Sequence, residues 1–215
     1  NLNIWTPGIQ DEGKRPVMVW LHGGGFSTGS SIEQTYYDGE NLSKKGDVVV
    51  VSVNHRLNVL GHLNLSQYGD QYKNSANVGM TDIIDALQWI QDNIEEFGGD
   101  PDNVTVFGES GGGAKVLALM TSPYAKGLFH KGIVESGATE TMGVIFTPED
   151  ASERVTELTL EKLGITPDRI DELQNVSYEE LTAASNEALA QAGEEFQIPA
   201  ALGSGYSLSW EPVVD

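Results

Sequence analysis

Ser110 is the residue of this 215-residue chain whose surroundings point most directly to chemistry. It stands at the centre of the sequence Gly-Glu-Ser-Gly-Gly, residues 108–112, directly after the apolar run Val104–Phe107. A serine between glycines at the end of a buried strand is typical of a sharp strand-to-helix turn that exposes its hydroxyl group. With a base beside it and amide N–H groups around it, such a hydroxyl can attack an ester carbonyl. The alternative is a turn of small residues without chemistry.

A second element of the same chemistry lies far upstream, where residues 22–26 read His-Gly-Gly-Gly-Phe after the apolar run 17–21. Attack on a carbonyl places negative charge on its oxygen, and N–H groups aimed at that oxygen stabilise the charge. Glycine tolerates the backbone angles that such a loop needs. We therefore expect Gly24 and Gly25 to form an oxyanion hole together with Gly111, the residue after the nucleophile. The alternative is a flexible glycine turn.

The four histidines of the chain offer no convincing general base. His22 directly precedes the glycines and would have to swing across the oxyanion hole, so we expect it to brace the loop by hydrogen bonds. His55 and His62 precede the serine, whereas hydrolases with this elbow run in the order serine, acid, histidine. His130 follows the serine but is typical of a surface histidine before a strand. We therefore expect both the base and the acid to lie outside this chain.

The elements around these motifs alternate between strands and helices, which predicts an α/β fold with a mostly parallel central sheet and helices on both faces. Ile83, Leu87, Ile90, Ile94 and Phe97 recur at helical spacing and predict one long amphipathic helix, which Gly98 and Pro101 end. A second helix is expected after Ser110. The expected strands cover residues 2–5, 17–21, 48–53, 104–107 and 132–135.

The character of the sequence changes after about residue 147, where two acidic helices are predicted with a helical linker around Pro167 between them. We expect three segments along the chain. Residues 1–140 form the N-terminal part of a catalytic core, residues 141–209 a helical excursion of the same domain, and residues 210–215 the start of the next core strand. The sequence also begins and ends in strand-like stretches, so we expect it to be part of a longer polypeptide.

The amino-acid composition of the chain limits the classes of partner that it could bind. The formal net charge is -20, with sixteen acidic against three basic residues in the segment 140–215. Such acidity argues against nucleic acid and anionic membranes as partners. There is no cysteine, and no apolar run approaches the length of a membrane span. We expect a soluble protein, cytoplasmic or secreted, and the motifs imply neither a metal nor a cofactor.

The motifs together resemble the type-B carboxylesterases, the cholinesterase-like branch of the α/β-hydrolases. Pro16 to Gly29 is similar to the family's P-V-x-V-W-x-H-G-G-G-F-x-x-G segment, and Asn77 to Gly113 to the stretch that ends in F-G-E-S-A-G. Further similar stretches are residues 2–7, 54–63, 136–137 and 210–215. The resemblance is strong over residues 1–140. It implies the α/β-hydrolase fold, of which this chain would hold the N-terminal portion.

Four positions depart from the family pattern. Gly111 replaces the usual alanine after the nucleophile, which predicts a looser turn with its N–H still available. His55 and His62 replace aromatic residues, so packing near the site is expected to differ. Ile83 stands where glutamine is typical. None of these changes removes a group that the chemistry needs.

The resemblance implies a triad of serine, glutamate or aspartate, and histidine, with Ser110 as nucleophile. It further implies that Glu109 and Ser136 lie behind the reacting groups, near the triad acid. A salt bridge with Arg56 beneath the site is an equally good interpretation of Glu109. The acid and the histidine would lie past Asp215, in the remainder of the polypeptide.

These observations predict a serine hydrolase that cleaves carboxylic esters of small molecules through an acyl-enzyme intermediate. The present segment alone would be incomplete. Two alternatives remain open: a cholinesterase-like binding or adhesion protein without catalysis, and an enzyme with a lipase-type substrate range. A non-catalytic member is expected to lack the nucleophile, and Ser110 counts against it.

Overall fold

The computed structural model of the protein describes most of the chain, namely residues 1–137, 146–200 and 204–214. Backbone proximity divides the chain into two compact units, and each is described by itself. The first unit comprises residues 1–55 and 80–144, and the second comprises residues 56–79 and 145–215.

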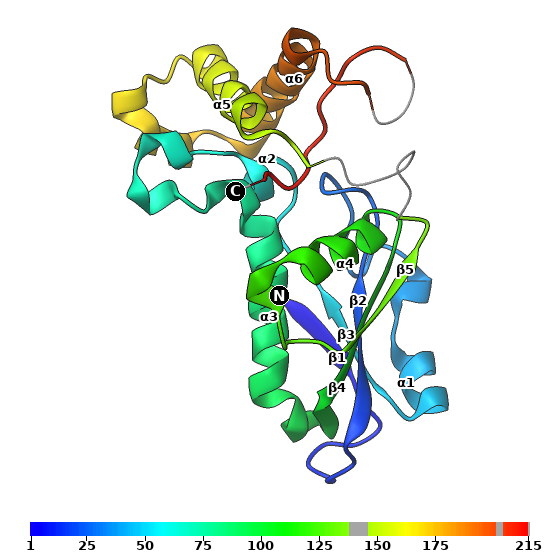
Figure 1. The fold of residues 1–215 in the computed structure, drawn as a ribbon. Coiled ribbons are helices and arrows are strands. Elements are labelled where there is room, and N and C mark those ends of the chain that lie inside the picture. The colour runs from blue at the N-terminus through cyan, green and yellow to red at the C-terminus, as the bar shows by residue number, and fades with distance from the viewer. Residues whose placement is uncertain (138–145, 201–203, 215) are drawn as a thin grey trace. The chain divides into compact units, whose positions relative to one another are not determined.

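The first unit is built on a five-stranded sheet of order β1-β3-β2-β4-β5 (Figure 1). Only β1 runs antiparallel to its neighbour, and the other pairs are parallel. Each predicted strand is present, and β4 begins earlier than expected because Gly99 pairs with Arg15. The strands are β1 (Leu2–Trp5), β2 (Arg15–Leu21), β3 (Val49–Val53), β4 (Gly99–Glu109) and β5 (Lys131–Glu135).

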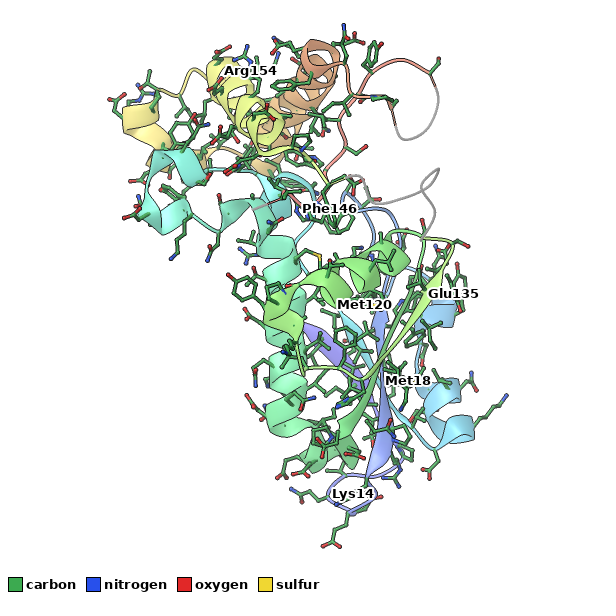
Figure 2. All side chains as sticks on the ribbon, in the orientation of Figure 1. Lys14, Met18, Met120, Glu135, Phe146 and Arg154 are labelled. Carbon is green, nitrogen blue, oxygen red and sulfur yellow. The ribbon has the colours of Figure 1, made fainter. Side chains whose placement is uncertain are left out.

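Valines fill the centre of this sheet. Val19 of β2 is paired with Val51 of β3 on one side and with Val106 of β4 on the other, and all three are fully buried. Strands covered on both faces are expected to be this uniformly apolar. Helix α1 (Glu40–Gly46) lies on one face of the sheet, with α3 (Val78–Asn93) and α4 (Gly111–Thr121) on the other (Figure 1). Side chains fill the space between sheet and helices (Figure 2).

Helix α3 follows its sequence pattern closely up to its last turn. Ile83, Leu87 and Ile90 are fully buried, as their spacing predicts. The helix ends at Asn93, however, and residues Ile94–Phe97 form a 3₁₀ helix, η5, instead of a further α-helical turn. The backbone of Asn93 is no longer helical, and Gly98 closes the segment in the left-handed conformation at φ 72°.

The second unit consists of helices. Its two long helices pack against each other, with Val155 and Leu158 of one and Ala188 and Leu189 of the other buried. The elements are α2 (Asn58–His62), η2 (Ser66–Tyr68), η3 (Asp70–Tyr72), η4 (Ser75–Asn77), α5 (Glu149–Leu163), η7 (Pro167–Asn175) and α6 (Tyr178–Phe196); the first unit also holds η1 (Thr35–Tyr37) and η6 (Pro123–Ala125). None of the helices in the described ranges is long and apolar enough to cross a membrane.

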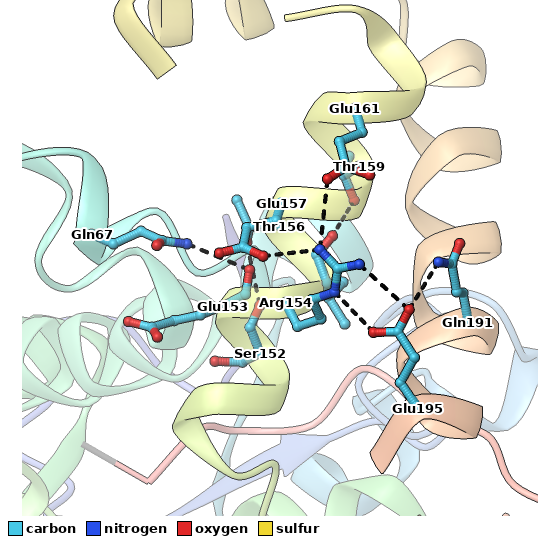
Figure 3. A network of polar contacts seen from close by, with 11 residues as sticks. Gln67, Ser152, Glu153, Arg154, Thr156, Glu157, Thr159, Glu161, Gln191 and Glu195 are labelled. Carbon is cyan, nitrogen blue, oxygen red and sulfur yellow. Dashed lines mark hydrogen bonds and ion pairs between the residues drawn. The ribbon is translucent and has the colours of Figure 1, made fainter. Parts of the chain in front are cut away.

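Arg154 joins the two long helices of the second unit by charge (Figure 3). Its guanidinium lies 2.8 Å from a carboxylate oxygen of Glu195 on α6 and 3.0 Å from one of Glu157 on its own helix. Hydrogen bonds to these carboxylates raise the pKa of Arg154 above its ordinary value and lower that of Glu195. The arginine thus offsets part of the repulsion within this acidic segment.

The last described residues do not extend the sheet. Val213 forms a single parallel bridge with Thr147, and its amide donates to Asn77 Oδ1 at 2.9 Å. Within the described residues this bridge is the β-pairing found in the segment 210–214, and the expectation that residues 210–215 begin the next core strand stays a prediction.

We expect Leu87→Ala to lower the free energy of unfolding by about 2–5 kcal/mol, because it opens a cavity where α3 packs on the sheet. Gln88→Ala is the matched control: Gln88 is the next residue along the helix and is exposed, so its replacement should cost less than about 0.5 kcal/mol. Urea denaturation of both variants measures the difference. Equal stabilities would contradict the described packing of α3.

Candidate active site

The two sequence motifs meet because their strands are neighbours. Leu21, the last residue of β2, is in register with Gly108 near the end of β4, and the two strands are parallel. Their carboxyl ends therefore lie at the same edge of the sheet, which is where α/β folds place ligand sites. The glycine loop leaves one strand, and Ser110 follows the other.

Ser110 occupies a strained backbone conformation at φ 55° and ψ −121°. Its N–H donates to the carbonyl of Glu135 on β5 at 2.8 Å, and its own carbonyl accepts from the Ala114 N–H at 3.1 Å. A non-glycine residue held in this way costs about 1–3 kcal/mol and marks a functional site often enough to suggest one. The turn also requires Gly112, where a methyl group would lie 2.0 Å from the carbonyl oxygen of Leu21. Ser110 is partly exposed.

The glycine loop turns through two residues with positive φ, Gly24 at 85° and Gly25 at 60°. The carbonyl of Gly24 closes the turn by accepting from the N–H groups of Ser27 and Thr28 at 3.3 and 3.1 Å. Within the described part of the chain, the N–H groups of Gly24, Gly25 and Gly111 donate no hydrogen bond. All three predicted donors are thus available to a bound group.

The loop and the elbow touch at Gly25 and Gly111. A methyl group on Gly111 would lie 2.4 Å from the Gly25 nitrogen and 2.5 Å from its Cα, which real contacts do not allow. A methyl group on Gly23 would lie 3.4 Å from Ser110 Cβ. Gly111 therefore permits this close approach of the loop and the elbow.

His22 is buried behind the loop. Its Nδ1 lies 2.8 Å from the carbonyl oxygen of Gly23, and its ring meets that of His55 edge to face at a centroid distance of 4.9 Å. Nε2 has no hydrogen-bond partner in the described residues. Burial and the nearby Lys115 charge lower the pKa of His22 to about 4. The ring is therefore neutral near pH 7, with the Nδ1 proton donated to Gly23.

Glu109 and Ser136 flank the elbow. Glu109 ends β4 and is exposed, and a methyl group on Gly23 would lie 3.3 Å from its Oε2. Ser136 follows β5, is exposed, and has a positive φ of 53°. The structure brings both side chains to the edge where Ser110 lies; their predicted roles near a triad acid stay predictions.

The other two histidines lie elsewhere. His130 is exposed, and its Nδ1 accepts from the Val104 N–H at 3.1 Å, near the amino end of the core part of β4 and away from Ser110. His62 belongs to the second unit, where its Nδ1 lies 3.2 Å from the carbonyl oxygen of Ala76. Neither His130 nor His22 is placed as a base for Ser110. The described residues contain no cluster of three histidine or acidic side chains that could hold a metal ion.

One residue of the site was missed by reasoning from sequence. Lys115 lies on α4, five positions after Ser110, and is fully buried. Its Nζ donates to the carbonyl of His22 at 2.9 Å. The available signal was a single lysine in a helix of otherwise small and apolar residues, which sequence analysis alone would read as a solvent-exposed position.

The strained turn at Ser110 and the glycine loop with its free backbone amides lie at one edge of a mostly parallel sheet, which is the arrangement of an α/β-hydrolase. Comparison with known proteins agrees with this class. A family model described as "Carboxylesterase family" matches residues 1–215. The chain belongs to the carboxylesterase family, and its fold is the N-terminal portion of an α/β-hydrolase.

Curated relatives carry esterase names. The para-nitrobenzyl esterase of Bacillus subtilis is 44% identical over 198 residues, which cover 92% of this chain and 39% of that protein. Human carboxylesterase 3 is 48% identical over 145 residues, which cover 67% of this chain and 24% of that protein. The chain thus spans about two fifths or less of the length of these relatives.

Solved structures give the same result. An esterase of Clostridium hathewayi, described as hydrolysing aliphatic aromatic polyesters, superposes with a TM-score of 0.81 at 50% identity over 87% of this chain and 37% of that chain. A Geobacillus stearothermophilus carboxylesterase gives 0.79 at 42% identity, over 86% of this chain and 39% of that one. The predicted family and fold are therefore confirmed.

The electrostatic surroundings of His22 predict its titration. The pKa of about 4 lies below the usual value of 6.5, so protonation favours the unfolded chain. The contribution of the neutral His22 ring to the stability of the folded state is complete above about pH 6.5, and it is lost as the pH falls toward 4. NMR titration of the ring, assigned with a His22→Gln variant, should show no change between about pH 6 and 8. A midpoint at the ordinary histidine value would contradict the described burial.

Proposed function

We propose that this chain carries the nucleophile and the oxyanion hole of a serine hydrolase that cleaves carboxylic esters. The observation that supports the proposal best is the strained Ser110 beside the free amides of Gly24, Gly25 and Gly111. The remainder of the polypeptide would supply a carboxylate and a histidine. The esterase names of the relatives support the same reaction class.

The reaction would follow the two-step course of acyl transfer. The Ser110 hydroxyl loses its proton to the histidine and bonds to the ester carbonyl carbon, and the amides hold the resulting oxyanion. The bond to the alcohol then breaks, and the histidine gives its proton to the leaving oxygen. Water, deprotonated by the same histidine, next attacks the acyl-serine; the bond to Ser110 breaks, the histidine returns the proton to the serine oxygen, and the carboxylic acid leaves.

We propose small-molecule esters as substrates, with p-nitrobenzyl and p-nitrophenyl esters as first candidates. The name of the Bacillus subtilis relative supports the first of these. A series of p-nitrophenyl esters of increasing acyl length separates the substrate classes, because a short-chain esterase loses kcat/KM with length and a lipase gains it.

The direct test is labelling of the full-length protein with a fluorophosphonate, which bonds to an activated serine. We expect one label per molecule at Ser110, and Ser110→Ala should abolish labelling and lower kcat by about 10⁴-fold or more. Ser122→Ala, at the other end of α4, is the matched control and should retain both. A folded wild-type protein without label or activity would favour the non-catalytic binding protein instead.

The close contact between loop and elbow predicts a second effect. Gly111→Ala should push the Gly25 backbone away, because no methyl group fits at 2.4 Å from its nitrogen. Loss of one well-placed donor costs about 10²-fold in kcat. In the control Gly46→Ala, the added methyl group meets only side chains of Val48 and Leu42, at 3.4 Å or more, and activity should persist. Unchanged kcat in Gly111→Ala would show that the described contact has no part in catalysis.

A further inference from the structure

Lys115 is a charged residue in a place that normally excludes charge. It is fully buried in α4, and its helical neighbours Ala114, Val116 and Leu119 are apolar and buried. Removing an ammonium group from water costs several kcal/mol unless the protein supplies bonds in return. A methionine of similar length would fill the same space without that cost. The contacts of the ammonium group therefore call for an explanation.

Two of those contacts lie at the two ends of the glycine loop. The Nζ atom donates to the carbonyl of His22, which precedes the glycines, at 2.9 Å. It also lies 5.5 Å from the centre of the Phe26 ring, which follows the glycines. Phe26 is itself buried, at 2% exposure. One cation thus contacts both residues that bracket Gly23–Gly25.

The hydrogen bond to His22 sets the orientation of the loop. In a planar trans peptide the C=O and N–H bonds point in opposite directions. Because the His22 carbonyl points to the Lys115 ammonium group, the N–H of Gly23 points away from that group. The following residues, Gly24 and Gly25, have the positive φ angles that only glycine adopts easily, and the bond from Lys115 adds a restraint at the start of the loop to the turn that the Gly24 carbonyl closes.

The charge itself also acts in this region. It is one of the causes that lower the pKa of His22, after burial, so its field reaches across the loop. Other groups near His22 are the ring of His55 and the carboxylate of Glu109 beside Gly23. A positive charge in a dry site favours negative charge that develops nearby, and it acts more strongly there than in water.

We propose that Lys115 is a positioning residue for ester hydrolysis: its ammonium group anchors the glycine loop at His22 and thereby stabilises the oxyanion that the amides of this loop hold. This inference rests on the proposed function. Lys115 itself touches no substrate, since it lies beneath the loop and is fully buried. It acts through the amides of Gly24 and Gly25.

The test uses the full-length enzyme with Lys115→Met, which keeps the length of the side chain and removes its charge. Lys126→Met, at an exposed lysine just beyond the same helix, is the matched control. We expect Lys115→Met to lower kcat on p-nitrophenyl acetate about 10–100-fold per active site, with KM within about twofold. Sites are counted by fluorophosphonate labelling carried to completion. The control should equal the wild type.

Two further measurements separate this role from a merely structural one. A trifluoromethyl ketone, which forms a tetrahedral adduct with the serine, should bind Lys115→Met more weakly by the same factor as kcat falls. The pKa of His22, read by NMR, should rise above about 4 in Lys115→Met and stay unchanged in Lys126→Met. A Lys115→Gln variant keeps a donor without the charge, and its kcat and its affinity for the ketone should lie between those of the wild type and those of Lys115→Met.

The outcomes are distinguishable. If the wild-type protein shows neither labelling nor hydrolysis, the proposed function is wrong. If the wild type is active and Lys115→Met keeps both kcat per site and ketone affinity, the inference about Lys115 is wrong. If neither Lys115 variant folds, the wild type still decides, because the ¹⁵N signal of the Lys115 ammonium must shift when the ketone adduct forms. An unshifted signal overturns the inference.

Discussion

The site depends on a close contact between two backbone segments that are more than eighty residues apart. Gly25 lies against Gly111 at a distance that leaves no room for even a methyl group. This contact holds the free amides of the loop beside the serine. It exists because β2 and β4 are parallel neighbours whose carboxyl ends lie together, with Leu21 in register with Gly108. The buried valines of the sheet thus determine where the glycine loop and Ser110 lie.

This arrangement costs free energy, because it strains the backbone at one residue and buries the charge of another. Ser110 adopts a backbone conformation that serine avoids, and Lys115 carries its charge into the interior. Both are compensated locally, Ser110 by hydrogen bonds to Glu135 and Ala114 and Lys115 by the carbonyl of His22. Departures from local preference that surrounding structure supports are typical of functional sites.

Much of the fold followed from the sequence because the signals were periodic or local. The β-branched run at residues 48–53 and the stripe through Ile83, Leu87 and Ile90 predicted β3 and α3 correctly. The serine elbow and the glycine loop were recognisable because their glycines are required by steric limits. The burial of Lys115 was not predictable, since it depends on a loop 93 residues upstream. The close approach of Gly111 and Gly25 was not predictable either, because the two residues are distant in sequence.

The most direct measurement is a crystal structure of the full-length protein with Ser110 phosphonylated. The account predicts a phosphonyl oxygen within about 2.7–3.1 Å of the amide nitrogens of Gly24, Gly25 and Gly111. The carbonyl of His22 should remain bonded to Lys115 behind them. A phosphonyl oxygen directed to solvent, with those amides unoccupied, would contradict the account.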